Sequence, residues 1–190
     1  MTPFITVEGE AVALDAANID TDQIIPARFL RKDRSAGYQN FLFHDVRAEP
    51  GFPLNGRQPV ILAAGPNFGC GSSREGAVYA LVDAGIRCVI AASFGDIFAG
   101  NAAKNGLLTI VLPEPDVAAL RRMLPATMRV DLPSQRLLLP DGSERRFEIE
   151  PFRKRCLLEG LDDIGLTLEH QARIASFQER DRAARPWATP

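Results

Sequence analysis

Residues 67–76, NFGCGSSREG, combine residue types and spacing that suit the binding of an anion. An apolar run, PVILAA, precedes this stretch, and a second one, AVYALV, follows it. The pattern predicts a loop between a strand and the beginning of a helix. Backbone N–H groups at such a position lack partners, and the helix dipole adds partial positive charge. We therefore expect the loop to bind a negatively charged group.

Each residue type in the stretch contributes a separate property. Gly69 and Gly71 permit close approach of a ligand or a positive φ angle. Ser72 and Ser73 carry hydroxyl donors, while the guanidinium of Arg74 fits a carboxylate or a phosphate. The stretch is neither a Walker A loop nor a G-x-G-x-x-G motif, because the lysine of the first and the third glycine of the second are missing. The plain alternative is a helix N-cap at Ser72 or Ser73, with Arg74 in a surface ion pair.

The hydrophobic pattern predicts the elements that hold this loop. Residues 60–64, 86–93 and 107–113 form apolar runs that are typical of buried strands. Helical patterns over residues 73–84 and 96–105 separate these runs, and each pattern ends at a glycine. This βαβαβ order is typical of a mainly parallel sheet with crossover helices.

The flanking segments predict further elements. Residues 4–14 alternate like a strand or a hairpin, and residues 31–57 predict a long irregular connection. Beyond the parallel unit we expect a helix at 116–124, short antiparallel strands with a turn at 141–142, a helix stopped by Gly160, a polar C-terminal helix at about 168–184 and a frayed tail at 186–190. We expect residues 1–190 to form a single domain.

The composition narrows the function classes. The chain has 190 residues, 46% of them hydrophobic, and a net charge of 22 − 24 = −2. A strong attraction to nucleic acid or to an anionic membrane is therefore not expected. No apolar run approaches the roughly 20 residues of a membrane span, and the N-terminus lacks the pattern of a secretory signal. We expect a cytoplasmic protein.

Residues that ligate metals are few and scattered. Cys70, Cys88 and Cys156 have spacings that fit neither a disulfide framework nor an iron–sulfur motif. His44 and His170 are far apart in the sequence, so a histidine metal site or a Ser-His-Asp triad is poorly supplied. We expect no metal site on this chain, core positions for Cys88 and Cys156, a packing role for Cys70 and structural roles for both histidines.

The whole string NFGCGSSRE resembles the signature of the aconitase superfamily swivel domain, and most closely that of the isopropylmalate dehydratase small-subunit family. Further strings in the family's order extend the resemblance from about residue 4 to residue 177. They are LDAANIDTDQIIPARFL, GYQNFLFHD, ASFGDIFAGNAAKNGLL and GLDDIGLTLEH. The resemblance implies an α/β fold, the swivelling β/β/α three-layer domain of the aconitase C-terminal type.

The resemblance also implies a reaction. Family members are hydro-lyases that isomerise a hydroxy-acid by removing water and adding it back with the hydroxyl on the neighbouring carbon. In the isopropylmalate dehydratase family the substrate is 2-isopropylmalate, the product is 3-isopropylmalate and the pathway is leucine biosynthesis. A [4Fe–4S] cluster on the large subunit acts there as the Lewis acid. The resemblance therefore implies a heterodimer in which this chain holds no cofactor of its own.

The same resemblance assigns roles within the loop. Ser72 matches the serine that takes a proton from a substrate carbon as an alkoxide. Ser73 matches a donor to a substrate carboxylate, and Arg74 and Gly71 match positions at the substrate. Because a serine hydroxyl is a poor base, its anion needs the helix N-terminus and the nearby N–H groups.

Two other segments are candidates for the site. Asp20, Thr21 and Asp22 match a family motif and either line a pocket or cap a helix. The second segment matches the loop associated with substrate choice, and its residues are Phe29, Leu30, Arg31 and Lys32. The basic residues at positions 31, 32 and 34 either meet an extra carboxylate of the substrate or face the solvent or the partner.

One departure from the family pattern concerns the residue after Ser-Ser-Arg-Glu, which is usually histidine and is Gly76 here. Together with the basic loop, it keeps open the small subunit of a related hydro-lyase, such as a homoaconitase or a methyl-substituted malate hydratase. An alternative of another class is a stand-alone module that binds a dicarboxylate or a phosphate at residues 69–74 without a partner.

Overall fold

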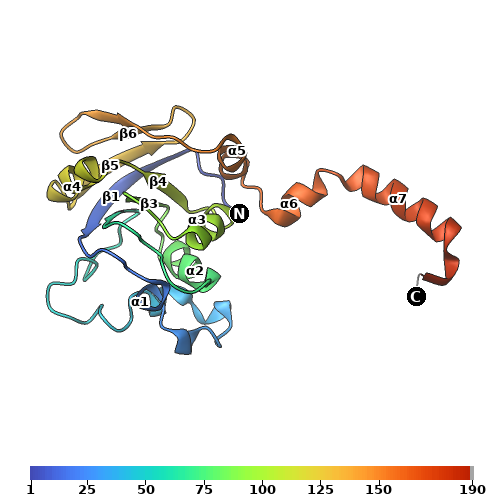
Figure 1. Cartoon of the computed structure of the whole chain (residues 1–190), viewed down its shortest axis with the longest axis horizontal. Helices are drawn as coiled ribbons and strands as arrows, with labels where there is room; N and C mark the ends of the chain where they lie inside the picture. The colour runs from blue at the N-terminus through green and yellow to red at the C-terminus, as the bar shows by residue number, and fades with distance from the viewer. Residues whose placement is uncertain (189–190) are drawn as a thin grey trace.

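The computed structural model describes residues 1–188, which form a seven-stranded mixed sheet with helices around it (Figure 1). The strands lie in the order β4-β3-β2-β1-β5-β6-β7. Their bounds are β1 (Thr6–Leu14), β2 (Ile61–Ala64), β3 (Cys88–Ala91), β4 (Leu108–Val111), β5 (Ala126–Asp131), β6 (Arg136–Leu138) and β7 (Glu144–Arg146). The helices are α1 (Thr21–Ile24), α2 (Glu75–Asp83), α3 (Asp96–Lys104), α4 (Glu114–Arg122), α5 (Pro151–Glu159), α6 (Asp163–Leu168) and α7 (Gln171–Ala184).

The parallel half of the sheet confirms the predicted βαβαβ unit. Strands β1, β2, β3 and β4 pair in parallel, with Cys88 opposite Leu108 in the last pair. Every residue of β2 and β3 is buried, because both faces of a parallel sheet are covered. Gly85 and Gly106 follow α2 and α3 at φ angles of +89° and +78°, the left-handed conformation that closes a helix.

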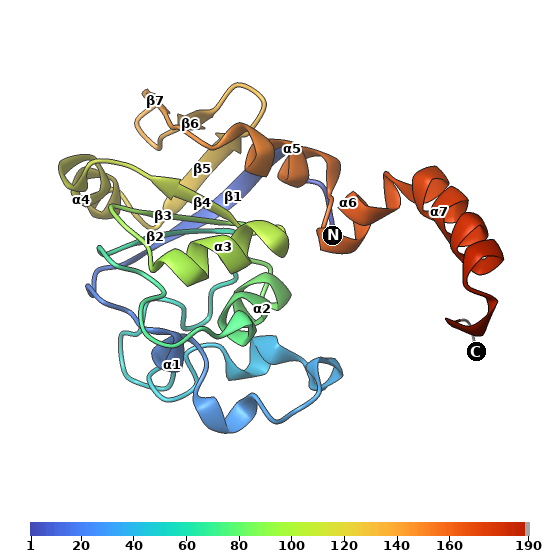
Figure 2. The same cartoon turned by 45° about the vertical axis from the view of Figure 1, so that its right-hand side comes forward.

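The antiparallel half confirms the predicted short strands. It runs from β1 through β5 and β6 to β7. The last hairpin turns at the predicted Asp141-Gly142, where the carboxylate of Asp141 accepts a hydrogen bond from the N–H of Ser143 at 2.9 Å. In Figures 1 and 2 these strands lie, together with α4 and α5, on the opposite side of the parallel strands from α2.

Two hydrophobic clusters fill the two faces of the sheet. The first joins sheet residues such as Val12 and Leu62 to α2, α3 and the turns between residues 24 and 54. The second joins the intervening residues, such as Ile61 and Ile90, to α4, α5 and strands β5 and β6. The alternation follows from the two-residue period of a strand. The layers agree with the mixed α/β class that the sequence predicts.

The connection between β1 and β2 is long and irregular, as predicted. It contains 3₁₀ turns at Ala27–Phe29, Arg34–Ala36 and Tyr38–Phe41. Figure 2 shows these blue turns directly below α2, and the turn at Tyr38–Phe41 contacts that helix. The connection therefore covers one side of the helix that follows the glycine–serine loop.

The structure confirms the predicted C-terminal helix, which is α7 at Gln171–Ala184. A further helix that the sequence did not predict, α6, precedes it, and the two extend away from the body as an arm (Figure 1). The carboxylate of Asp162 caps α6 by accepting from the N–H of Gly165 at 2.7 Å. The predicted frayed tail contains a 3₁₀ turn at Pro186–Ala188, and its last positions, 189–190, lie outside the described residues. Of the helices in residues 1–188, none combines the length and hydropathy needed to cross a bilayer.

Candidate active site

The glycine–serine loop follows β2 at the carboxyl end of the parallel strands. The N–H of Phe68 donates to the carbonyl of Ser93 at 3.1 Å, and the N–H of Gly95 donates to the carbonyl of Phe68 at 2.9 Å. The N–H of Asn67 donates to Oγ of Ser93 at 2.8 Å. These bonds join the loop to the connection after β3, because both strands end at the same edge. Open α/β sheets bind their ligands at this edge.

Close packing fixes the path of the loop. Gly69 has a φ of +73°, and a Cβ built on it would clash with the ring of Phe98 on α3. A Cβ on Gly95 would lie 2.6 Å from the carbonyl oxygen of Gly69. Both positions therefore require glycine. The loop is held against α3 before it reaches the serines.

The segment before α1 supports the loop from the other side. The N–H of Gly69 donates to the carbonyl of Ile19 at 2.7 Å, and the N–H of Thr21 donates to the carbonyl of Cys70 at 3.0 Å. The buried hydroxyl of Thr21 donates to the carbonyl of Ser72 at 3.0 Å. The structure thus brings together two motifs that lie 51 residues apart in the sequence.

The two carboxylates of this segment have partners within the protein. Asp20 caps α1 by accepting from the N–H of Gln23 at 2.8 Å. Asp22 forms an ion pair with Arg74, through Nη1 of the guanidinium. The helix cap considered for Asp20 is therefore present, while Asp22 orients the arginine of the loop.

Arg74 is the N-cap residue of α2, and no side chain caps this helix. The alternative in which Ser72 or Ser73 is the capping residue is wrong, because the helix begins later than that interpretation requires. The ion pair that the same alternative placed at Arg74 is present. The side chain of Arg74 is 19% exposed and that of Asp22 is 52% exposed, so the pair lies at the surface of the loop.

Ser72 and Ser73 are exposed, as is Gly71, which has a φ of +87°. Because the N-cap residue makes no side-chain hydrogen bond to α2, the first N–H groups of this helix have no capping side chain within residues 1–188. Two hydroxyl groups, a guanidinium and a helix N-terminus therefore meet at one exposed loop. This arrangement can bind a carboxylate and stabilise an oxyanion.

The candidate specificity segment lies against α2. Phe29 and Leu30 are half-buried and pack on the hydrophobic cluster of this face. A Cβ built on Gly76, in the first turn of α2, would lie 2.5 Å from Cδ2 of Leu30. Arg31 and Lys32 are exposed. The apolar half of the segment thus contacts the helix, whereas the basic half faces the solvent.

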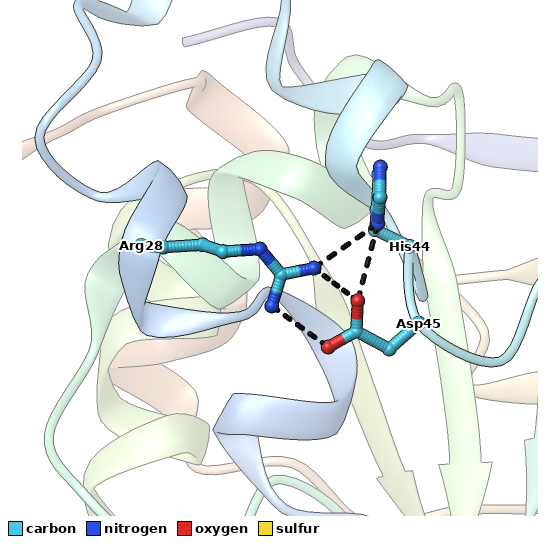
Figure 3. A network of polar contacts seen from close by, with 3 residues as sticks. All are labelled: Arg28, His44 and Asp45. Carbon is cyan, nitrogen blue, oxygen red and sulfur yellow. Dashed lines mark hydrogen bonds and ion pairs between the residues drawn. The ribbon is translucent and has the colours of Figure 1, made fainter.

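An exposed polar network stabilises the same connection (Figure 3). Nη1 of Arg28 donates to Oδ2 of Asp45 at 2.9 Å, and Nη2 pairs with Oδ1. Nδ1 of His44 lies 3.3 Å from Nη2 of Arg28 and 3.2 Å from Oδ1 of Asp45. The hydrogen bonds from Arg28, followed by that of His44, lower the pKa of Asp45 to about 2. His44 therefore belongs to a network that fixes the loop.

Arg34 is also engaged within the protein. Its Nε and Nη2 donate to Asp83 at 3.2 and 2.6 Å, and its guanidinium lies 4.1 Å from the centroid of the Tyr79 ring. The hydrogen bonds to Asp83 raise the pKa of Arg34, and burial raises the pKa of Tyr79. Arg34 is therefore already paired, whereas the side chains of Arg31 and Lys32 are exposed.

The cysteines occupy separate parts of the fold. Cys88 and Cys156 are buried, as predicted, and Cys70 is half-buried in the glycine–serine loop. Burial raises the pKa of both Cys88 and Cys156, so neither thiol ionises readily. Within residues 1–188, no three side chains of His, Cys, Asp or Glu are grouped so that they could hold a metal ion.

Three residues that shape the loop lie within the family strings but were not among the predicted site residues. They are Asn18, Ser93 and Gly95. Nδ2 of Asn67 donates to Oδ1 of Asn18 at 2.8 Å, and the other two hold the loop through the bonds and contacts described above. Ser93 and Gly95 directly follow a buried strand, and in a parallel sheet this position alone indicates proximity to the next βα loop.

Comparisons with known proteins define the class to which the fold and loop belong. Residues 52–115, which include the glycine–serine loop, match the family described as aconitase C-terminal domain. The crystal structure of 3-isopropylmalate dehydratase from Methanocaldococcus jannaschii superposes with a TM-score of 0.70 at 27% identity, covering 92% of this chain and 99% of that chain. The chain therefore has the fold of an aconitase C-terminal domain.

More similar relatives narrow the class further. A protein of Rhodospirillum centenum named 3-isopropylmalate dehydratase small subunit is 50% identical over 99% of both chains. Its namesake from Rhodopseudomonas palustris strain HaA2 is 48% identical over 99% of this chain and 100% of its own. Residues 163–190 match the family described as the C-terminal domain of the 3-isopropylmalate dehydratase small subunit. The chain belongs to the 3-isopropylmalate dehydratase small subunit family.

Proposed function

We propose that this chain is the small subunit of a 3-isopropylmalate dehydratase and isomerises 2-isopropylmalate to 3-isopropylmalate in leucine biosynthesis. The proposal rests on the pair of exposed serines before an uncapped helix, in a chain that belongs to this family. In this reaction water is removed from the acid and added back with the hydroxyl on the neighbouring carbon.

Ser72 is the base in this proposal. Its alkoxide takes a proton from the CH₂ carbon of 2-isopropylmalate while the hydroxyl leaves the neighbouring carbon, and a double bond forms between the two carbons. Water then adds with its hydroxyl on the former CH₂ carbon and a proton on the carbon that bears the isopropyl group. The first N–H groups of α2 and its dipole stabilise the alkoxide and the charge that builds on the adjacent carboxylate.

Ser73, Arg74 and Gly71 bind the substrate carboxylates. Arg74 contacts Asp22 through Nη1, which leaves its remaining N–H donors for a carboxylate. Gly71 has no side chain to shield its backbone from the ligand. Thr21 acts through the carbonyl of Ser72 and is a positioning residue. In this scheme each loop residue has one task, and the segment before α1 holds the loop in shape.

The Lewis acid of the reaction belongs to a partner in our proposal, the large subunit of the dehydratase. A [4Fe–4S] cluster on that subunit supplies the acid for the departing hydroxyl. Two observations support this division: residues 1–188 group no ligand set for a metal, and the serines are exposed on an open surface. We further propose that residues 1–190 act as one domain, arm included, in a cytoplasmic heterodimer that binds neither membrane nor nucleic acid.

The structure favours an alkyl-substituted malate over an acid with a third carboxylate. A third carboxylate needs a cation turned towards the loop, but Arg34 is paired with Asp83, and Arg31 and Lys32 face the solvent. The half-buried part of the candidate specificity segment, Phe29 and Leu30, is apolar. An isopropyl group fits such a surface better than a carboxylate does.

Anaerobic reconstitution with the cluster-bearing large subunit tests the proposal. We expect the heterodimer to dehydrate 2-isopropylmalate, which is measured through the absorbance of the unsaturated intermediate. Neither chain alone should show turnover. Ser72→Ala should abolish turnover without preventing assembly. Ser134→Ala, in the exposed turn between β5 and β6, is the matched control and should retain it.

Other outcomes would contradict separate parts of the proposal. Turnover of homocitrate in place of 2-isopropylmalate would overturn the substrate. Full turnover by Ser72→Ala would remove the assignment of the base. Tight binding of a dicarboxylate to the isolated chain, measured by calorimetry and coupled with no activity in the assembly, would favour a stand-alone binding module.

A further inference from the structure

The first turn of α2 contains a glycine whose missing side chain leaves room for the candidate specificity segment. Gly76 is buried, and a Cβ on it would lie 2.5 Å from Cδ2 of Leu30 and 3.4 Å from Cε2 of Tyr38. Its backbone is helical, so no left-handed conformation requires glycine here. Glycine is unfavourable inside a helix relative to alanine. What the glycine provides is space, and Leu30 fills it.

Other contacts hold Leu30 in this position. Oη of Tyr38 donates to the carbonyl of Lys32 at 2.9 Å, and the N–H of Lys32 donates to the carbonyl of Phe29 at 3.0 Å. The ring of Phe29 stacks on that of Phe41 with centroids 4.3 Å apart. The segment at residues 29–32 is therefore an ordered unit. We call the contact between Leu30 and the first turn of α2 the Leu30 seat.

The Leu30 seat adjoins the glycine–serine loop. Gly76 lies in the helical turn that Arg74 begins, and Arg74 pairs with Asp22. On the same side, Thr21 holds the carbonyl of Ser72. Because Ser72, Ser73 and Arg74 directly precede α2, a shift of Leu30 away from the helix changes the spacing between residues 29–32 and the two serines.

We propose that Gly76 is a positioning residue for substrate choice, an inference that rests on the proposed function. By admitting Leu30 against α2, it sets the width available to the alkyl branch of the substrate acid. A side chain at position 76 pushes Leu30 outward, and the apolar wall retreats from the branch. We expect kcat/KM to fall mainly for a substrate with a bulky branch, because a small branch makes fewer contacts with that wall.

The comparison of two acids in the reconstituted heterodimer tests the inference. We expect Gly76→Ala to lower the ratio of kcat/KM for 2-isopropylmalate to kcat/KM for 2-methylmalate by about tenfold. Gly100→Ala is the matched control, since this glycine also lies inside a helix, α3, and a Cβ on it would meet nothing within 4 Å. The control should leave the ratio unchanged.

Limited proteolysis tests the Leu30 seat independently of any activity assay. Arg31 and Lys32 are exposed, and the contacts around them restrain their backbone. In the isolated chain, Gly76→Ala should accelerate trypsin cleavage after these two residues. Cleavage after Arg180, in the arm, serves as the internal reference and should not change.

A double variant separates the contact from a general loss of structure. In a Leu30→Ala background, Gly76→Ala should have no further effect on the ratio or on cleavage, because the shortened side chain leaves room for a Cβ. An unchanged ratio with faster cleavage would overturn the link to substrate choice, and unchanged cleavage would overturn the seat itself. If the unmutated heterodimer turned over neither acid, this result would contradict the proposed function. The inference about the space for the alkyl branch would then also be wrong.

Discussion

The hydroxyl of Thr21 donates to the carbonyl oxygen of Ser72 at 3.0 Å, and the side chain that makes this bond is buried. Thr21 is 2% exposed, and it is the one buried polar residue in the part of the chain that the structure describes, residues 1–188. A buried hydroxyl requires a hydrogen-bond partner. The backbone of the proposed base is thus held by a residue from another segment, which makes Thr21 the most direct test of how the loop is positioned.

Thr21→Val keeps the shape of the side chain and removes the donor. We expect the free energy of unfolding to fall by about 1 kcal/mol, and turnover of the heterodimer to fall about tenfold because the serine loop is less well placed. Thr21→Ser retains the hydroxyl and should keep most of the turnover. Urea denaturation and the dehydration assay measure the two effects. Full turnover by the valine variant would show that this bond does not position Ser72.

Gly69→Ala should be far more damaging than an alanine at another glycine with a similar φ. Gly51 has a φ of +80° and open space around its Cβ position, so Gly51→Ala should cost about 1 kcal/mol from the left-handed conformation alone. At Gly69 the clash with the ring of Phe98 is added, for a total of about 3 kcal/mol. Urea denaturation of both variants gives the difference. Equal losses would mean that the loop is not packed against α3.

The Asp45 carboxylate should contribute to stability at neutral pH and lose this contribution in acid. Its pKa is lowered from 3.8 to about 2, chiefly by the hydrogen bonds from Arg28. Because the folded pKa lies below the unfolded one, the contribution is fully present above about pH 4 and is lost as the pH falls towards 2. Denaturation of the unmutated chain and of Asp45→Asn should therefore converge over this interval. A difference that stayed constant down to pH 2 would contradict the pairing.

Cys70 should react with an alkylating agent before Cys88 does. Cys70 is half-buried in the serine loop, whereas Cys88 and Cys156 are buried and have raised pKa values. We expect Cys70 to be labelled in the native chain, and Cys88 only after unfolding. Mass spectrometry of the labelled peptides after timed quenching distinguishes them. Rapid native labelling of Cys88 would contradict its place in the central strand β3.

The parallel half of the fold was predictable because its signal is local. Strands β2 and β3 are buried on both faces, so they appear in the sequence as unbroken apolar runs. Gly85 and Gly106 mark the ends of the intervening helices for the same local reason. Helix α6 was not predicted, because its six residues are too few to show a helical period, although Asp162 caps it.

The site was only partly predictable. The residues of the loop are recognisable as a string, but the contacts that hold it join distant positions: Thr21 with Ser72, and Asp22 with Arg74. No local pattern encodes a contact across about 50 residues of chain. Gly76 illustrates the limit, because its sequence context suggests only a helix of reduced stability. That Gly76 leaves room for Leu30 can be recognised only in the three-dimensional structure.

The position of the only tryptophan in the arm limits what intrinsic fluorescence can report about folding. Helix α7 has 14 residues and buries none of them, and an isolated helix of this length is marginal in water. Its amide protons should therefore exchange by local opening, whereas those of β2 and β3 should exchange only through global unfolding. The single tryptophan of the chain, Trp187, lies beyond α7 and is 79% exposed. Intrinsic tryptophan fluorescence will consequently report the state of the arm, and the unfolding of the sheet will pass without a change in that signal.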